Sequence, residues 1–296
     1  MSVYLSQLEQ MKALPVVRAV MEQAGLALPT DRWDIRTTGS AHLIINMGSE
    51  LSVRVAKTQK TGHLVARRTE ILRRLPADLP FEVPRPITRV ITRHGITAVG
   101  LSWIKGEPRP QGPAPAKQLA AALKAIHRID YRGYEPYLDS IHEHWGGKEN
   151  WVDFLQQQVI PQLLSGSQKI ALQALDQALN LAKVEPTLIH GDLAGHNILW
   201  KGEKLVGVID WDHASIGDPA IDHAAVGNYY GWEVLERFLT KPQLQRAHVL
   251  AALLPLQSLA YTMRAGMGGA IQRLAIERAD DWYLEHREQI SSCCES

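Results

Sequence analysis

Hydrophobic positions change their spacing along the chain and divide it into two regions. Apolar residues recur at helical spacing over roughly the first thirty residues and again beyond residue 115, while short β-branched runs dominate between them. The runs at 42–46, 50–56 and 97–104 predict strands, and the turn residues at 47–49 predict a hairpin between the first two. Apolar residues at helical spacing over 64–75 predict a helix that ends at Pro76.

The segment 105–115 separates the two regions. It holds four prolines and two glycines in eleven residues, a composition typical of a linker. Beyond it the pattern predicts helices at 115–128, 149–164 and 167–182, a strand at 187–189, a hairpin of 197–200 with 205–209, and helical segments from 219 to 288 with breaks at Pro242 and 266–269. We therefore expect two domains: a β-rich lobe over 1–104, with a helical extension at 1–30, and a mostly helical lobe over 105–296.

The charge balance excludes some classes of function. The 296 residues include 32 Lys and Arg against 31 Asp and Glu, which argues against a nucleic-acid partner bound mainly through phosphates. No apolar run reaches the length that spans a bilayer, and the first residues lack the pattern of a signal peptide, so we expect a cytoplasmic protein with no membrane partner. The neutral total hides an asymmetry: residues 1–104 contain 14 Lys and Arg against 8 Asp and Glu, a net +6, whereas 105–296 contain 18 against 23, a net −5.

The most informative motif follows the strand at 187–189. His190-Gly191-Asp192 is followed five residues later by Asn197, and Asp210 ends the next hairpin. Transfer of a phosphoryl group from ATP requires a carboxylate that orients the acceptor hydroxyl and two oxygen ligands for Mg²⁺. Because the three residues occur in the order found in kinases, we interpret Asp192 as catalytic and Asn197 and Asp210 as metal ligands. Protein kinases place Arg at position 191, so the motif points away from protein kinases.

With these motifs, the sequence resembles the aminoglycoside phosphotransferase and choline kinase-like superfamily of small-molecule kinases. The resemblance covers nearly the whole chain from about residue 30 and also includes the segments 103–108, 208–212 and 217–222. Within that superfamily, the stretch 190–227 looks most like viomycin and capreomycin phosphotransferases. The resemblance implies a protein-kinase-like α+β fold: a small, five-stranded antiparallel N-terminal lobe that binds the nucleotide, and a larger, mostly helical C-terminal lobe that carries catalysis and binds the acceptor.

The nucleotide-binding residues are expected in the N-terminal lobe. The small and polar segment 38–42 precedes a strand, which suits a loop over the ATP phosphates with contacts from Gly39, Ser40 and His42. The resemblance of segment 103–108 to the hinge of the family places the adenine near backbone groups of Ser102, Trp103 and Ile104.

A basic residue on the next strand is expected to hold the phosphates. The resemblance assigns this position to Arg54, and Lys57 is close enough in sequence to compete. The family also implies an acidic partner on the helix that follows. Glu70 is the only acid there and lies off the apolar face, whereas Arg68 occupies the inward position, so the sequence leaves the pairing open.

Three residues near the motif are expected to have supporting or no roles. We expect His190 to brace the loop by hydrogen bonding, and the resemblance implies that Asp222 stabilises the same loop. Asp212 would point to the opposite side from Asp210 if the strand continued, so we expect it to be solvated.

The sequence thus predicts an ATP- and Mg²⁺-dependent phosphotransferase that acts on a hydroxyl of a small cationic antibiotic, either an aminoglycoside or a peptide of the viomycin and capreomycin type. The net −5 of residues 105–296 favours a polycationic acceptor. The alternatives are a kinase for a metabolite such as choline, homoserine or thiamine, a macrolide kinase, and a nucleotide-binding pseudokinase. The sequence leaves open the acceptor hydroxyl, the choice of ATP or GTP, and the oligomeric state.

Overall fold

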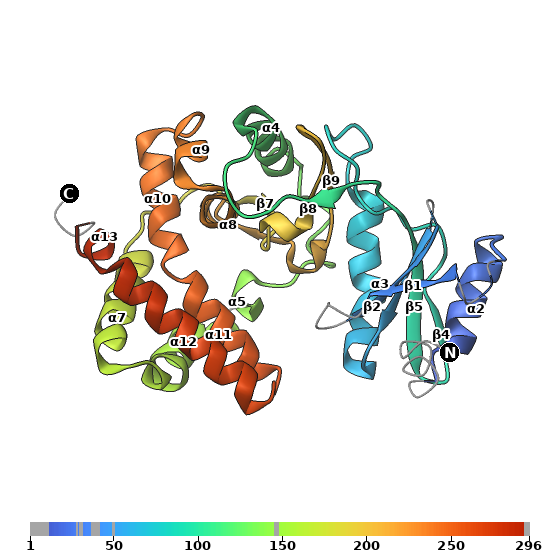
Figure 1. The fold of residues 1–296 in the computed structure, drawn as a ribbon, viewed down its shortest axis with the longest axis horizontal. Helices are drawn as coiled ribbons and strands as arrows, with labels where there is room; N and C mark the ends of the chain where they lie inside the picture. Colours follow the sequence, from blue (N-terminus) through green and yellow to red (C-terminus); the bar gives the residue numbers. More distant parts are fainter. Residues whose placement is uncertain are drawn as a thin grey trace. The chain divides into compact units, whose positions relative to one another are not determined.

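The chain divides into two compact units. The computed structural model describes residues 12–27, 29, 32–36, 42–48, 51–144 and 148–292. Unit 1 comprises the described residues up to Arg109 together with Gly133–Leu138 and His196–Asp212. Unit 2 comprises Pro110–Arg132, Asp139–Gly195 and the described residues from His213 onward. Both units therefore contain separate stretches of the chain, and each is considered by itself (Figure 1).

A five-stranded antiparallel sheet is the centre of unit 1. Its strands lie in the order β1-β2-β3-β5-β4 and run over Asp34–Arg36 (β1), His42–Met47 (β2), Leu51–Ala56 (β3), Ile91–Arg93 (β4) and Ile96–Ser102 (β5). The antiparallel sheet expected from the sequence is confirmed. Sequence reasoning missed β1 and β4, which are three residues long; β4 joins β5 through His94-Gly95, a turn with positive φ at both residues.

Two helices, α2 (Leu14–Gln23) and α3 (Gln59–Arg74), pack on this sheet (Figure 1). Because side chains alternate along a strand, Val53 and Val55 of β3 belong to the core formed with α2, whereas Arg54 points to the other face, toward α3. The core with α2 contains fully buried aliphatic side chains: Val16, Val17, Val20, Ile45, Val53, Val55. The sheet thus holds Arg54 on a rigid element, opposite the inward face of α3.

Both ends of α3 are stabilised by side chains. Thr58 and Thr61 form a reciprocal capping box at the N-terminus. At the C-terminus, the guanidinium of Arg85 donates to the carbonyls of Leu72 (3.1 Å), Leu75 (2.6 Å) and Pro76 (2.5 Å). Arg85 therefore satisfies carbonyls that the helix leaves without intrahelical partners and places a positive charge at the negative end of the helix dipole.

A second sheet of unit 1 contains β6 (Glu107–Pro108), β8 (Ile198–Lys201) and β9 (Lys204–Val208), in the order β6-β8-β9. The segment at Glu82 joins this sheet, since its N–H donates to Val206 and its carbonyl accepts from Val208. Close packing requires glycine at position 207, where a β carbon would lie 2.6 Å from the Ile104 side chain. The hairpin expected at 197–209 is confirmed.

Unit 2 is mostly helical. Its α-helices are α4 (Ala116–His127), α5 (Ile141–His144), α6 (Trp151–Phe154), α7 (Ser165–Leu179), α8 (Ala220–Tyr230), α9 (Trp232–Glu236), α10 (Lys241–Ala251), α11 (Leu254–Arg264), α12 (Gly269–Glu285) and α13 (Arg287–Ser292), and its one described sheet pairs β7 (Thr187–Ile189) with β10 (Ser215–Gly217). Side chains from α7, α11 and α12 form its core, in which the Tyr283 hydroxyl donates to Ala252 O at 2.7 Å. Among the described residues, no helix combines the length and apolarity needed to cross a bilayer.

One helix prediction for unit 2 was wrong in detail. The single helix expected at 149–164 is interrupted, because a π-helical turn at Leu155–Val159 and a 3₁₀ turn at Ile160–Gln162 follow α6. Pro161 explains the second interruption, since it lacks the N–H that would continue the helix. The break expected at Pro242 is confirmed, since α9 ends at Glu236 and Pro242 lies in the first turn of α10, where proline is tolerated.

We predict that Arg85→Met lowers the free energy of unfolding by about 2–3 kcal/mol, because three carbonyls at the end of α3 lose a charged donor. Urea unfolding followed by circular dichroism measures the change. Arg93→Met on β4 is the matched control, since Arg93 is exposed and lies away from a helix end. Equal effects of the two substitutions would contradict the capping role of Arg85.

Candidate active site

The loop after β7 in unit 2 carries the predicted base Asp192. The carboxylate of Asp222, in the first turn of α8, accepts hydrogen bonds from the backbone N–H of His190 (2.9 Å) and of Gly191 (2.9 Å). The Asp192 N–H lies 3.3 Å from Nδ1 of His190, which accepts the hydrogen bond. The expectations that His190 braces the loop and that Asp222 stabilises it are both confirmed. Asp192 itself is half-buried at the end of this loop.

Asp222 is fully buried and has a further partner on α4. Nε2 of His127 lies 3.0 Å from Asp222 Oδ2. Burial alone would raise the pKa of Asp222, but the hydrogen bonds and charges of His127 and His190 outweigh it and lower the pKa. Asp222 therefore stays ionised, and a fixed negative charge orders the loop that carries Asp192.

Glycine is required at position 191. Gly191 adopts a φ of +78°, and a β carbon there would lie 2.2 Å from the carbonyl oxygen of His213. Both the backbone conformation and the close backbone contact exclude a side chain. The glycine that distinguishes this motif from that of protein kinases is thus fixed by the packing of the loop against the segment before β10.

The open end of the β8–β9 hairpin in unit 1 carries the two predicted metal ligands. Asn197 precedes β8, Asp210 follows β9 by two residues, and the N–H of Ile209 donates to the Asn197 carbonyl at 2.9 Å. The two candidate metal ligands are therefore brought to the same end of one hairpin. Asp210 has a φ of +59°, an uncommon conformation for a residue other than glycine, and its side chain is 47% exposed.

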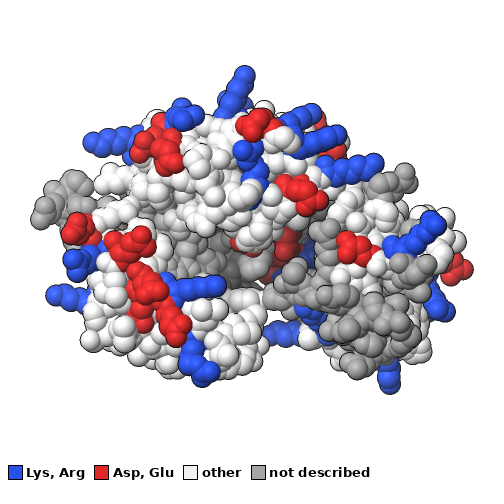
Figure 2. Space-filling model, viewed as in Figure 1, with Lys and Arg blue, Asp and Glu red and all other residues white. Residues whose placement is uncertain are grey.

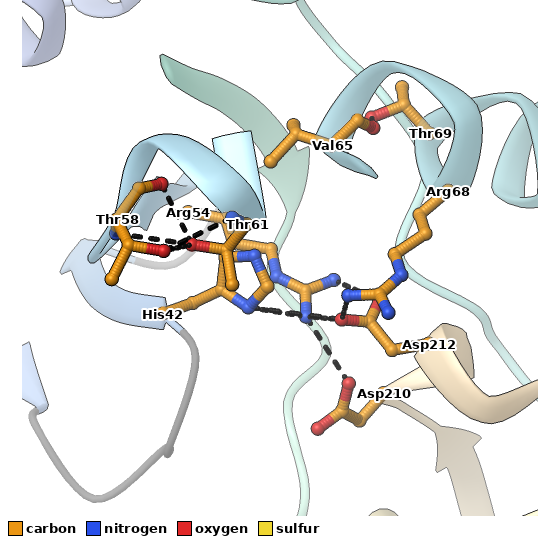
Figure 3. A network of polar contacts seen from close by, with 9 residues as sticks. All are labelled: His42, Arg54, Thr58, Thr61, Val65, Arg68, Thr69, Asp210 and Asp212. Carbon is orange, nitrogen blue, oxygen red and sulfur yellow. Dashed lines mark hydrogen bonds and ion pairs between the residues drawn. The ribbon is translucent and has the colours of Figure 1, made fainter. Parts of the chain in front are cut away.

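Arg54 lies beside Asp210 in a network of charged side chains (Figure 3). Its Nη1 and Nη2 donate to the two oxygens of Asp212 at 2.8 and 2.6 Å, and Nη2 also lies 3.3 Å from Asp210 Oδ1. Although burial lowers the pKa of Arg54, the carboxylates of Asp212 and Asp210 raise it more. The structure thus brings Arg54 close to Asp210, as the predicted roles in binding the phosphates and Mg²⁺ require. It also pairs Arg54 with Asp212, for which the sequence predicted no role.

The expectation that Asp212 is solvated was wrong. Its side chain is 8% exposed, and Arg68 of α3 donates to its Oδ2 at 2.9 Å. Burial would raise the pKa of Asp212, but Arg54 and Arg68 hold it well below its usual range. The chain does not continue as a strand after Val208, because the left-handed conformation of Asp210 leads into a 3₁₀ turn at Trp211–His213, which turns Asp212 inward.

The acidic partner of Arg54 is therefore Asp212. Glu70 lies on α3 at 35% exposure and pairs with Arg73 (3.4 Å) and Arg74 (3.2 Å) of its own helix. Such exposed pairs within one helix contribute little to stability. The usual polarity is inverted in this chain, since α3 supplies a cation, Arg68, to a carboxylate that comes from the segment after β9.

His42 is the described residue of the predicted phosphate loop. It is 5% exposed, and its Nδ1 lies 3.0 Å from Arg54 Nη2, so the ring belongs to the network around Arg54 (Figure 3). Burial and the positive charge of Arg54 lower the pKa of His42 to about 3, so the ring is neutral at pH 7. Gly39 and Ser40 lie outside the described residues.

The predicted hinge residues follow β5. The Ser102 N–H donates to Arg85 O at 2.8 Å, its hydroxyl accepts from the Arg85 N–H at 2.8 Å, and the Ile104 carbonyl accepts from the Gly106 N–H at 3.1 Å. Ile104 is buried and Trp103 is half-buried. The Ser102 N–H is thus already engaged, whereas the Ile104 carbonyl oxygen can accept a second hydrogen bond.

Sequence reasoning missed Asp212, Arg68 and His127 as members of the site. The sequence contained a signal for Asp212 and Arg68. An arginine at an inward position of a helix requires an acidic partner, and α3 has no acid on its inward face. His127 carries no such signal, because its partner Asp222 lies 95 residues away and only the fold joins them.

We predict that Gly191→Ala lowers the free energy of unfolding by about 3 kcal/mol or more, because it adds overlap with the His213 carbonyl to an unfavourable φ. Gly202→Ala is the matched control, since Gly202 has a φ of +58° and open space around it, and should cost about 1 kcal/mol. Urea unfolding of both variants measures the difference. Similar losses would show that the contact with His213 does not restrict the loop.

Known proteins share the fold of this chain. Residues 36–254 match the model of the phosphotransferase enzyme family. The chain is 27% identical to the viomycin phosphotransferase of Streptomyces vinaceus over 248 residues, which cover 77% of this chain and 86% of that protein. The fold is similar to that of aminoglycoside 2'-phosphotransferase-IIIa in its GDP complex (TM-score 0.77, 16% identity, 92% of this chain and 99% of the other). It is also similar to APH(2")-IIa in its ternary complex with streptomycin and ATP (TM-score 0.66, 17% identity, 90% and 95%). The small antiparallel sheet and the larger helical part are thus those of a kinase-like fold, and the chain belongs to the phosphotransferase enzyme family.

Proposed function

We propose that this phosphotransferase moves the terminal phosphoryl group of ATP, with Mg²⁺, to a hydroxyl of a small cationic antibiotic, of the aminoglycoside type or of the viomycin and capreomycin peptide type. The observation that carries the reaction is the loop at 190–192, which a buried carboxylate holds in one conformation with Asp192 at its end. The observation that carries the acceptor class is the similarity to viomycin phosphotransferase over most of both chains.

Asp192 is proposed as the catalytic base. In the reaction the acceptor oxygen forms a bond to the γ-phosphorus, the bond from that phosphorus to the ADP oxygen breaks, and the hydroxyl proton passes to the Asp192 carboxylate. Positioning accounts for most catalysis of phosphoryl transfer, so the hydrogen bonds from the loop to Asp222 support this role. His190 would orient the loop and would transfer no proton.

Asn197 and Asp210 are proposed as the residues that hold Mg²⁺. The fit is chemically reasonable, because an amide oxygen and a carboxylate at one hairpin end are the hard oxygen donors that Mg²⁺ prefers. Among the described residues, no group of three or more His, Cys, Asp or Glu side chains could hold a metal. Two oxygen ligands from the protein are enough, because Mg²⁺ usually takes its remaining ligands from water and from the phosphates of the substrate. When bound, the ion offsets the charge of the phosphates.

Arg54 is proposed as the cation that binds the phosphates, ahead of Lys57. Arg54 is fixed on β3 beside Asp210, whereas Lys57 follows the end of that strand. The pseudokinase alternative depended on an absent partner for Arg54, and Asp212 supplies that partner. The charge distribution gives weaker support for a cationic acceptor. Residues 105–296 carry a net charge of −5, but the face shown in Figure 2 carries Lys and Arg as well as Asp and Glu side chains.

We predict that Asp192→Asn reduces kcat by about a hundredfold or more and leaves the Kd of the nucleotide nearly unchanged, because it removes the proton acceptor alone. Nucleotide consumption and calorimetric binding measure the two quantities. Asp176→Asn, an exposed position on α7, is the control and should behave as wild type. Retained turnover in Asp192→Asn would exclude the proposed base.

The acceptor class is tested by Mg²⁺-dependent ATP consumption across a panel of viomycin, capreomycin, aminoglycosides, macrolides, choline, homoserine and thiamine. We predict the highest kcat/KM for one of the first three, and a KM that rises with salt, because attraction of a polycation is screened. A preference for a macrolide or a metabolite would overturn the proposed acceptor and keep the reaction. Tight ATP binding without turnover on any acceptor would favour a pseudokinase.

A further inference from the structure

Asp212 occupies a position that the reaction described above does not use. Its carboxylate is buried, and both oxygens accept from Arg54 in a fork-like pair, while Oδ2 also accepts from Arg68 (Figure 3). A forked pair of this kind fixes the plane and the direction of the guanidinium as well as neutralising charge.

We propose that Asp212 is a positioning residue for nucleotide binding, which holds Arg54 toward the phosphates and keeps it from capturing the metal ligand Asp210. The proposal rests on the proposed function, since it takes the roles of Arg54 and Asp210 from it.

One nitrogen of Arg54, Nη2, contacts three side chains. Nη2 of Arg54 lies 2.6 Å from Asp212 Oδ2, 3.0 Å from His42 Nδ1 and 3.3 Å from Asp210 Oδ1. The shortest of these contacts is to Asp212, and the contact to Asp210 is the longest. Asp212 therefore outcompetes Asp210 for Arg54 and leaves the Asp210 carboxylate, which is half exposed, only weakly engaged.

Without the charge of Asp212, Arg54 would pair with Asp210 instead. Arg54 would then have Asp210 as its nearest carboxylate among the described residues, and a closer pair would withdraw an oxygen from the metal. The same residue thus affects both the direction of Arg54 and the availability of Asp210.

Arg68 adds a second positive charge beside Asp212. Arg54 and Arg68 balance the charges of Asp212 and Asp210, and without the proposed metal ligand Asp210 the other three side chains sum to +1. If Asp210 is engaged by Mg²⁺, the phosphates would meet these three side chains. Arg68 is 15% exposed on α3, so its contribution acts through the network.

The backbone around Trp211 directs both carboxylates to Arg54. Trp211 is 2% exposed and its Nε1 donates to Val208 O at 3.1 Å, which anchors the turn between Asp210 and Asp212. Asp210 has a left-handed backbone conformation beside this anchored turn, and the carboxylates of both Asp210 and Asp212 contact Arg54. The main chain of the turn therefore contributes to the placement of both carboxylates.

The test is nucleotide binding by the whole protein, measured by calorimetry with ATP in EDTA and with MgATP. For Asp212→Asn we expect the Kd of ATP to rise about ten- to hundredfold already without Mg²⁺, and the Mg²⁺ concentration for half-maximal binding to rise as well. An unchanged Kd in EDTA together with a higher Mg²⁺ requirement would overturn the proposal, because Asp212 would then act as a metal ligand. Unchanged values in both conditions would also overturn it, since the ion pair would be structural only.

Two further variants complete the test. Arg68→Met keeps the pair of Asp212 with Arg54 and should raise the Kd of ATP in EDTA several-fold while the Mg²⁺ requirement stays constant. If Asp212→Asn does not fold, Arg54→Lys, which keeps the charge but cannot form the forked pair, replaces it, and a wild-type Kd of ATP in EDTA for that variant overturns the proposal. Glu70→Gln is the matched control on the same helix, and its Kd should stay within about twofold of wild type. Binding needs no acceptor and no turnover, so failure of the Asp192 assignment and failure of this proposal are distinguishable.

Discussion

The pairing of one buried carboxylate with two guanidinium groups is the interaction on which unit 1 depends. Asp212 joins three elements that are distant in sequence: the strand β3 through Arg54, the helix α3 through Arg68, and the β8–β9 hairpin that it follows. Each of the three charges would be costly to bury without the others. The sheet, its covering helix and the hairpin are therefore fixed relative to one another by electrostatics as well as by apolar packing.

Unit 2 uses a buried carboxylate for a similar purpose with different partners. Asp222 accepts hydrogen bonds from two backbone N–H groups and lies beside a histidine, so it fixes the main chain of a loop. The two aspartates therefore use a buried charge in different ways. Asp212 directs other side chains, whereas Asp222 holds the backbone of the loop that leads to Asp192.

Sequence patterns predicted the fold more fully than the site. Periodicity located β2, β3, β5 and the helices α2 and α3 because they are long and regular, whereas β1, β4 and β6 are two or three residues long and the helix expected at 149–164 is broken by a π turn that has no periodic signal. The roles of Asp192, Asn197 and Asp210 were predicted from their spacing along the chain. Asp212 was predicted to be exposed because we extended the alternation of a strand past Asp210. The positive φ of Asp210, which ends the strand pattern, cannot be predicted from the sequence. His127 could not be found, since its role follows from a contact across the fold.

The interleaved composition of unit 1 has a consequence for how the protein is made. Its last stretch, His196–Asp212, arrives long after β3 and α3, so the partner of Arg54 is separated from it by 158 residues. Contacts of such sequence separation form late and slow folding. During synthesis the N-terminal stretch is made before Asp212, so Arg54 and Arg68 are present before this shared carboxylate, and burial of Arg54 without it would be costly. The ion pair between Arg54 and Asp212 can therefore form only after most of the chain has been made.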